Sequence, residues 1–372
     1  EFIIMKKSGL LLAAAALVLM GTGLTGCQTK TYEYALITDV GDIDDQSFNQ
    51  TSWEATKDFA EKNGKTVNYY RPTEDSTAAR LAAMEQAVNK GAKVIVCPGY
   101  LFEDAVYEAQ TTYPDVKFVL IDGQPHTADY QTYETKSNTV SIIFKEEIAG
   151  FLAGYAAVKE GNTKLGFCGG MAVPAVQRYG SGFVQGAEAA SKEMGINTTL
   201  KYYYAGAFAA TDGATATMKS WYTEGTETVF ACGGKGFQSV VAGCQEGSTK
   251  ATWIGVDTDQ AYVSEKVLTS AMKGLSAAVT SALEVYSQDK WTEIGGHDYN
   301  LGLDSVLGTV AKKDYVGIPT ADASWRFKTF TKAEYEAVLT KVKSGEITIS
   351  GDVKTAPVTE KVAVTWVSSF AQ

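Results

Sequence analysis

Short apolar runs rich in β-branched and aromatic residues alternate with longer segments of helical spacing, and this alternation constrains the fold of the chain most. A first set of apolar runs comprises residues 34–38, 66–70, 94–97 and 116–121, and a second set comprises 165–168, 200–204, 228–231 and 252–256. Alternation of this kind predicts parallel sheets, because consecutive parallel strands need a long, usually helical, crossover. The unbroken apolar character of residues 118–121 indicates strands that helices cover on both faces.

The chain is long enough for two lobes of this type. It has 372 residues, whereas single cores stop growing near roughly 250–300 residues. No Pro/Gly/Ser-rich linker separates the two sets of runs, so we expect the chain to cross between lobes at short hinges near residues 143–146, 272–274 and 301–310. The expected lobes are residues 34–143 with 274–300, and residues 144–273 with 301–372. Helices are expected at residues 78–89, 173–194, 211–224 and 332–343.

The amino-terminal residues have the layout of a secretory signal peptide. Lys6 and Lys7 precede an apolar run over residues 10–20, and residues 1–4 are interpreted as a start-site remnant. Eleven helical residues rise only about 16 Å, whereas a membrane span needs about 30 Å, so export is favoured over a transmembrane anchor. We therefore predict a signal segment over residues 1–26.

The run ends in Leu24-Thr25-Gly26-Cys27, which resembles the bacterial lipobox. This predicts acylation of Cys27, a linker over residues 27–33, and a folded body held outside the cell membrane by its lipid chains. Cys97, Cys168 and Cys232 lie in or beside apolar runs and are expected to be buried free thiols. A disulfide between Cys232 and Cys244 stays open, because spacing alone does not establish one.

Composition excludes several classes of function. Thirty-three basic against 43 acidic residues give a formal net charge of −10, which disfavours nucleic acid as a partner. The two histidines, His126 and His297, leave little material for a histidine-based triad or a zinc site. No cofactor is indicated.

Residues that follow the expected strands are the candidate ligand contacts, because open α/β sheets bind ligands beyond the carboxyl ends of their strands. These positions hold carboxylates, glycines and one aromatic residue: Asp39, Asp122, Gly234, Asp257 and, in the loop after 200–204, Phe208. Acids and close backbone approach suit a neutral, hydroxyl-rich ligand better than a phosphate, which prefers amide cradles and cations.

The acid-rich segment over residues 39–49 leaves three interpretations open. Its acids can cap the following helix, with Phe48 as a core anchor. A calcium loop is a second interpretation, although the ligand spacing of such loops is not met. The third is a ligand site that includes Asp39, Phe48 and Asn49. A Gly-x-Gly-x-x-x-Gly stretch at residues 180–186 does not match a dinucleotide-binding fingerprint and does not directly follow a strand.

The chain resembles the basic membrane protein family of substrate-binding lipoproteins, and within it the purine nucleoside receptors. The resemblance extends from Tyr34 to about Val362 and is most specific at residues 41–49, 254–260 and 268–273. It implies a periplasmic-binding-protein type I fold, with two Rossmann-like lobes joined by short hinges. It also implies a protein that performs no chemistry and passes a purine nucleoside to an ABC permease. We expect the protein to be a monomer.

The resemblance also implies roles for individual residues. Phe48 and Phe208 would stack on the two faces of the base, while Asp39, Asn49 and Asp122 would bind its edge. Asp257 and Lys273 would contact the ribose, with Gly234 allowing close backbone approach. Lys235 and Phe237 depart from the small or polar residues of many relatives at these positions, which puts the ribose side in doubt.

Competing functions remain at this point. A sugar or signalling-molecule receptor on the same fold would use similar aromatic and acidic residues. A metal-dependent nucleoside hydrolase would use the acids of residues 39–45 to hold a metal and activate water. A role as a surface adhesin or antigen is neither supported nor excluded.

Overall fold

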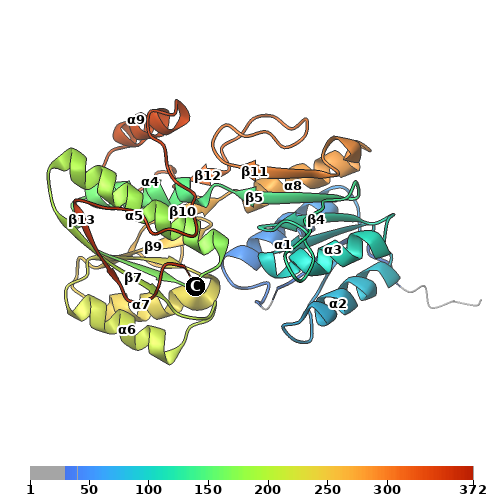
Figure 1. Ribbon diagram of the computed structural model, residues 1–372, viewed down its shortest axis with the longest axis horizontal. Helices are drawn as coiled ribbons and strands as arrows, with labels where there is room; N and C mark the ends of the chain where they lie inside the picture. The colour runs from blue at the N-terminus through green and yellow to red at the C-terminus, as the bar shows by residue number, and fades with distance from the viewer. Residues whose placement is uncertain (1–29, 40, 372) are drawn as a thin grey trace, which may run out of the picture. The chain divides into compact units, whose positions relative to one another are not determined.

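The computed structural model describes residues 30–39 and 41–371. The predicted signal segment and the predicted acylation site, Cys27, lie outside these residues. In the described part of the chain, six parallel strands form a first sheet in the order β11-β5-β4-β3-β1-β2 (Figure 1). Its strands are β1 (Tyr34–Ile37), β2 (Val67–Tyr70), β3 (Val94–Pro98), β4 (Lys117–Ile121), β5 (Thr139–Phe144) and β11 (His297–Leu301).

Every residue of β1 and β3 is buried, because helices cover both faces of this first sheet. The elements that accompany it are α1 (Phe48–Lys62), α2 (Thr77–Asn89), α3 (Glu103–Thr112), α8 (Leu275–Ser287) and the short 3-10 turns η1 (Tyr100–Phe102) and η3 (Trp291–Glu293). Tyr34 lies opposite Val67 of β2 and Val94 of β3. This register brings the carboxyl ends of the three strands level at one edge. We call this sheet with its helices lobe 1.

A second sheet has seven strands in the described residues, in the order β12-β10-β9-β8-β6-β7-β13, and only the short β12 runs antiparallel to its neighbour. Its strands are β6 (Lys164–Gly169), β7 (Thr198–Tyr204), β8 (Thr228–Cys232), β9 (Thr252–Asp257), β10 (Val267–Lys273), β12 (Val316–Gly317) and β13 (Val362–Trp366). Its helical elements are α4 (Glu146–Lys159), α5 (Pro174–Met194), α6 (Asp212–Thr223), α7 (Phe237–Glu246), α9 (Lys332–Lys343) and the turn η2 (Gly234–Gly236). We call this assembly lobe 2.

The predicted α/β class is confirmed, and the four expected helices are present within one residue of their expected bounds. The described chain passes between the sheets after β5, after β10 and after β11, which are the places where the sequence predicted hinges. Residues 31–372 form one compact unit, so the exact lobe boundaries stay a prediction.

Two of the three glycines at residues 180–186 serve helix packing, while Gly180 lies against the Tyr202 side chain of β7. A Cβ added to Gly182 would lie 2.0 Å from the carbonyl oxygen of Glu147, and one added to Gly186 would lie 2.0 Å from that of Phe151. Helices α4 and α5 therefore approach each other more closely than any side chain would permit at these positions. This contact explains the glycine spacing that superficially resembles a nucleotide-binding motif.

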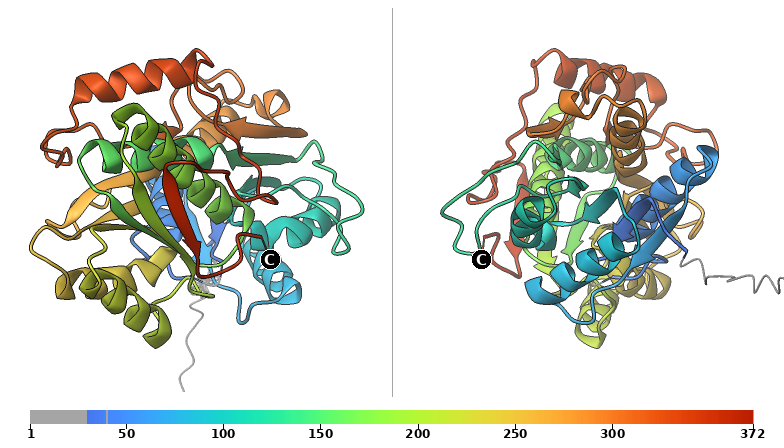
Figure 2. Two further views of the ribbon diagram at one scale, coloured as in Figure 1. Left: turned by 60° about the vertical axis from the view of Figure 1, so that its left-hand side comes forward. Right: turned by 90° about the vertical axis from the view of Figure 1, so that its right-hand side faces the viewer.

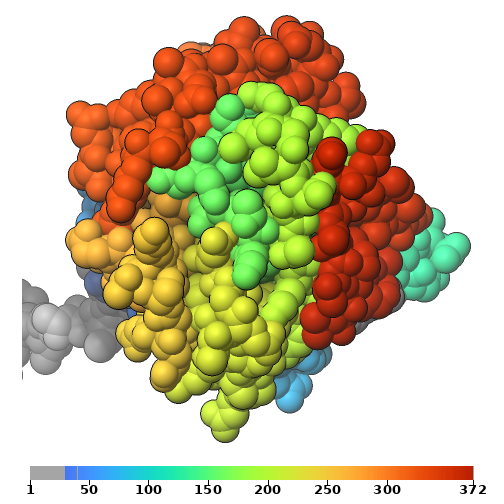
Figure 3. Space-filling view, turned by 90° about the vertical axis from the view of Figure 1, so that its left-hand side faces the viewer, coloured from blue at the N-terminus to red at the C-terminus, as the bar shows by residue number. Residues whose placement is uncertain are grey.

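The carboxyl-terminal segment returns to lobe 2. Strand β13 pairs with β7, as the red and green strands in Figure 2 show, and the Glu188 carboxylate on α5 accepts hydrogen bonds of 2.9 Å from the backbone N–H groups of Glu360, Lys361 and Val362. Figure 3 shows the red segment covering this side of the lobe. Residues far apart in sequence thus complete one sheet.

Candidate functional site

Strand ends of the two lobes bring most of the candidate residues together. Asp39 follows β1 and Asp122 follows β4 in lobe 1, while Asp257 ends β9 and Lys273 ends β10 in lobe 2. Because β9 and β10 are parallel neighbours, with Asp257 opposite Met272, Asp257 and Lys273 reach the same edge. The geometry follows the rule that open α/β sheets gather functional side chains beyond their carboxyl ends.

Asp45 fixes the start of α1. Its carboxylate accepts hydrogen bonds from the backbone N–H groups of Ser47 (2.9 Å), Asn49 (2.9 Å) and Gln50 (3.0 Å). Free N–H groups at a helix start need such an acceptor. The capping interpretation of the acid-rich segment therefore holds for Asp45, and Asp45 positions Phe48 and Asn49 in the first turn.

Asp39 and Asn49 form a second polar group in lobe 1. The Asn49 amide donates to Asp39 Oδ1 at 2.8 Å, and the Gly41 N–H donates to the same oxygen at 2.6 Å. Among the described residues, no donor reaches Asp39 Oδ2. Burial raises the pKa of Asp39 to about 6, against the lowering effect of these hydrogen bonds. Asp39 Oδ2 is thus an acceptor that no described donor fills.

A buried ionic group, which we call the inner cluster, surrounds Lys273. Its ammonium contacts the Asp122 carboxylate, lies 3.1 Å from Glu146 Oε1 and lies 3.9 Å from Asp257 Oδ1. Only 2% of the Lys273 side chain is exposed. Burial alone would lower the pKa of Lys273, but Asp122, Glu146 and Asp257 together raise it above its usual value. Lys273 is therefore a fixed cation.

The acids of the inner cluster differ in their surroundings. Glu146 Oε2 also accepts a hydrogen bond of 2.5 Å from Arg178 Nε. Burial opposes ionisation of Glu146, yet Arg178 and Lys273 hold its pKa below the usual value. Burial raises the pKa of Asp122 to about 7, although Lys273 opposes the rise. Asp122 Oδ1 is buried and has no hydrogen-bond partner among the described residues, so an unmet acceptor faces the cluster.

Asp257 joins the lobes directly. Its Oδ2 accepts a 2.6 Å hydrogen bond from the Ser47 hydroxyl of lobe 1, and its Oδ1 accepts one of 3.3 Å from the Tyr179 hydroxyl. Asp122 and Asp257 have φ values of 60° and 65°, in the left-handed region that few non-glycine residues adopt. Such backbone strain is concentrated at functional sites. The buried Gln260 adds a further contact, donating to the Gln46 carbonyl at 3.0 Å.

Each lobe has a candidate aromatic residue near its strand ends. The Lys273 ammonium is 5.2 Å from the centre of the Phe48 ring. In lobe 2, Phe208 lies against two glycines, since a Cβ added to Gly170 or Gly233 would meet its ring at 2.5 or 3.2 Å. Gly234 (φ 43°) continues this loop beside the Phe208 carbonyl. Opposed stacking by Phe48 and Phe208 on one ligand stays a prediction.

Lys235 and Phe237, which differ from the small or polar residues of many relatives, lie in different surroundings. Lys235 Nζ lies 2.7 Å from Asp44 Oδ1 and 3.5 Å from Asp42 Oδ2, and we call these three residues the mouth clasp. It links lobe 2 to the acid-rich segment of lobe 1, and the Asp44 side chain is 76% exposed. Phe237 is buried and stacks on Trp253 at 5.7 Å between ring centres. Phe237 thus belongs to the core.

Metal chemistry has no framework in the described residues. Across residues 30–39 and 41–371, no three His, Cys, Asp or Glu side chains are arranged to hold a metal ion. Of the acids proposed for a metal-dependent hydrolase, Asp45 caps α1, Asp42 pairs with Arg71 and Asp44 pairs with Lys235. Cysteines 97, 168, 232 and 244 are buried free thiols, so the structure contains no bond between Cys232 and Cys244.

No helix of the described chain is long and apolar enough to span a bilayer.

Sequence reasoning missed several contributors to the site. Glu146 begins α4, which follows the crossover into lobe 2, and Arg178 and Tyr179 lie on α5. Ser47 directly precedes α1, and Gln260 lies in the loop between β9 and β10. The strand-end rule found only residues that directly follow strands. The expected hinge at residues 143–146 ends on Glu146, and the segments 41–49 and 254–260, on which the resemblance rests, contain Ser47 and Gln260.

Two α/β lobes whose strand ends share a buried polar site define a two-lobed binding protein of the periplasmic type. Residues 33–350 match the family described as ABC transporter substrate-binding protein, PnrA-like. The chain belongs to this family, which confirms the resemblance to basic membrane proteins. It is an ABC transporter substrate-binding protein and not an enzyme.

Individual relatives agree with this assignment. The chain is 27% identical over 356 residues to the ABC transporter nucleoside-binding protein BmpA of Lactococcus lactis subsp. cremoris, covering 86% of this chain and 97% of that protein. It is 28% identical over 301 residues to an uncharacterized lipoprotein of Pyrococcus furiosus, covering 77% and 74%. A solved ABC transporter solute-binding protein from Aeropyrum pernix K1 has a TM-score of 0.72 at 20% identity, covering 87% and 93%, which supports the fold.

Proposed function

We propose that this protein binds purine nucleosides between its two lobes and presents them to an ABC permease. The observation that carries the proposal is the charge state of the inner cluster. Its cation, Lys273, is already surrounded by three carboxylates, so it cannot neutralise a phosphate. Free acceptors at Asp122 Oδ1 and Asp39 Oδ2 instead suit a neutral ligand with hydroxyl and N–H donors.

We assign the ligand's two ends from the contacts. Asp39 and Asn49 would bind the edge of the base. Asp122 touches Lys273 and therefore acts at the same end as Asp257 and Lys273, which we assign to the ribose in place of the base-edge role that the resemblance implied for Asp122. Phe48 and Phe208 would stack on the base, where each aromatic contact contributes about 1–3 kcal/mol, and Gly234 would permit close approach.

The nucleoside class also has support from the relatives, since one of them is named a nucleoside-binding protein. The small molecule released by denaturing protein that was purified without added ligand would test the class. Mass spectrometry should identify a purine nucleoside. A monosaccharide in its place would favour the sugar-receptor alternative and contradict the proposal.

We also propose that the protein is a monomer anchored by lipids on Cys27 to the outer face of the cell membrane. The lipobox-like sequence and a relative named as a lipoprotein support the anchor. Replacement Cys27→Ala should release the protein from the membrane fraction, because stable anchoring needs two or more acyl chains. Continued membrane retention of that variant would contradict the anchor.

A further inference from the structure

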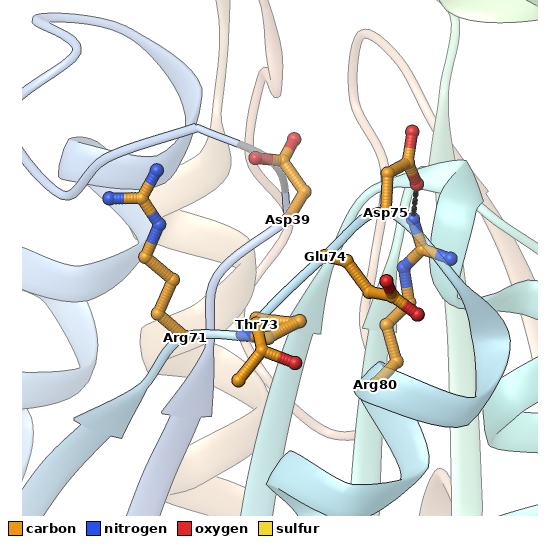
Figure 4. Close-up of a pocket in the computed structure, with 7 residues that line it drawn as sticks. Asp39, Arg71, Thr73, Glu74, Asp75 and Arg80 are labelled. Carbon is orange, nitrogen blue, oxygen red and sulfur yellow. Dashed lines mark hydrogen bonds and ion pairs between the residues drawn. The ribbon is translucent and has the colours of Figure 1, made fainter.

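A pocket opens in lobe 1 beyond Asp39, on the side away from the inner cluster. Its volume is about 550 Å³, and Figure 4 shows the side chains around it. The lining residues come from the end of β1, the loop after β2 and the first turn of α2: Asp39, Arg71, Pro72, Thr73, Glu74, Asp75 and Arg80. A volume of this size is within the range of small-molecule sites.

The sheet order sets the direction in which the site continues. Strands β4, β3, β1 and β2 are neighbours in that order, with Asp122 after β4 and Asp39 after β1. Adjacent strands lie about 4.8 Å apart. The pocket at the end of β2 therefore continues the row that begins at Asp122 and passes Asp39. A ligand that reaches Asp39 has this pocket next to its outer end.

The charges around the pocket favour hydrogen-bond donors over anions. Arg71 is paired with Asp42, and Arg80 is paired with Asp75 and lies 5.8 Å from the centre of the Phe102 ring. Each guanidinium group is therefore paired with one acid, while the buried Arg80 Nε has no hydrogen-bond partner among the described residues. The Glu74 carboxylate accepts only the Ser76 hydroxyl, at 3.0 Å, among the described residues, and Asp39 Oδ2 is also open. The Glu74 and Asp39 carboxylates make no ion pair with a described residue, although the charge of Arg80 acts on Asp39, and both can accept from a donor on a ligand.

We propose that this pocket is a subsite for a substituent on the base, and that the ligands of the protein include purine nucleosides extended at the base edge by a hydroxyl- or amine-bearing group. The proposal rests on the proposed function, since it needs the base edge to face Asp39. An anionic substituent is disfavoured in this class, because its charge would lie beside Glu74 and Asp39 while Arg71 and Arg80 are each already paired with an acid.

Calorimetry with ligand-free protein tests the subsite. The probes are adenosine and its hydroxyethyl, aminoethyl and carboxymethyl derivatives, made at N6 and, as a second series, at C2. In one series the hydroxyethyl and aminoethyl compounds should bind within about threefold of adenosine, and the carboxymethyl compound at least about tenfold more weakly. Equal, severe weakening of all extended compounds in both series would overturn the subsite while adenosine still binds. Loss of binding by adenosine, inosine and guanosine alike would overturn the proposed function, and the subsite with it.

Variants separate the pocket from a general tolerance of large ligands. Thr73 is exposed and lines the pocket, so Thr73→Trp should fill it and weaken the extended compounds at least about tenfold while adenosine affinity stays within about twofold. Thr111→Trp, at an exposed position of α3, is the matched control and should change neither. Glu74→Lys should bring the carboxymethyl compound close to the hydroxyethyl one. Retained binding of the extended compounds in Thr73→Trp would contradict the proposal.

Discussion

The inner cluster and the mouth clasp both join the lobes by ion pairs, but their surroundings differ. In the inner cluster, 2% of the Lys273 side chain and 8% of that of Asp122 are exposed. In the mouth clasp, 33% of Lys235 and 76% of Asp44 are exposed. Removing one partner of a buried pair leaves a costly unpaired charge, whereas exposed pairs contribute little and are screened by salt. An ion pair between the lobes therefore affects the free energy of unfolding strongly only where it is buried.

The largest expected effect comes from removing the cation of the inner cluster. Lys273→Met keeps most of the side-chain volume but leaves Asp122 and Glu146 facing each other without Lys273. We expect the free energy of unfolding to fall by about 3–5 kcal/mol, measured by urea denaturation. Adding Asp122→Asn should recover part of this loss, because it removes one unpaired charge. An additive second loss would contradict the coupling between the two residues.

The next effect is a pH dependence that comes from Asp39. Its pKa rises to about 6 in the folded protein from about 3.9 in the unfolded chain, so the folded state binds this proton more tightly. Asp39 therefore contributes stability that is complete below about pH 4 and is lost as pH rises through about 6. The unfolding free energy of the wild type, minus that of Asp39→Asn, should fall by about 1–3 kcal/mol from pH 4 to pH 7. If this difference stays constant over the range, the pKa of Asp39 is not raised in the folded protein.

Phe48 lies beside the inner cluster and should affect binding more than folding. Phe48→Ala should weaken nucleoside affinity at least about tenfold, roughly 1.4 kcal/mol, through loss of stacking. Calorimetry measures the affinity. Tyr130, whose side chain is 64% exposed, offers a control in Tyr130→Ala, which should bind as the wild type does. Equal affinity of the Phe48 variant and the wild type would place Phe48 outside the ligand site.

The smallest effect should come from the mouth clasp. Lys235→Ala should raise the rate of ligand dissociation by less than about fivefold at low salt, and the difference should vanish near 1 M salt. Stopped-flow displacement measures the rate. Lys219, paired with Glu246 on the surface, provides the matched control. A salt-independent increase of tenfold or more in the dissociation rate would contradict the interpretation of the mouth clasp as an exposed, screened ion pair.

Sequence reasoning predicted the fold and the strand-end residues because both follow from local rules. Apolar runs that alternate with helical spacing define the parallel sheets, and the ends of such strands collect functional groups. Strand β11 was missed because its sequence, HDYNL, lies on a mostly exposed edge and lacks apolar periodicity. Strand β10 includes the buried polar residues Thr269 and Ser270, which weaken the same signal.

Part of the site depended on contacts that sequence cannot supply. Glu146 pairs with Lys273 and with Arg178 across helices α4 and α5, which pack through glycines. Ser47 of lobe 1 reaches Asp257 of lobe 2 only when the lobes meet. The pocket beyond Asp39 likewise arises where the segments after β1 and β2 come together, with α1 between them in the chain. These are tertiary arrangements with no periodic signature.

We propose that a neutral purine nucleoside binds next to the inner cluster, with its ribose at Asp122, Asp257 and Lys273. Calorimetric titration of ligand-free protein with inosine, inosine 5′-monophosphate and ribose tests it most directly. We expect saturable binding of inosine at one site and much weaker binding of ribose. The monophosphate should bind at least about tenfold more weakly than inosine, because a like-charge contact at the carboxylates costs several kcal/mol. Absence of heat with inosine, or tighter binding of the monophosphate, would contradict it.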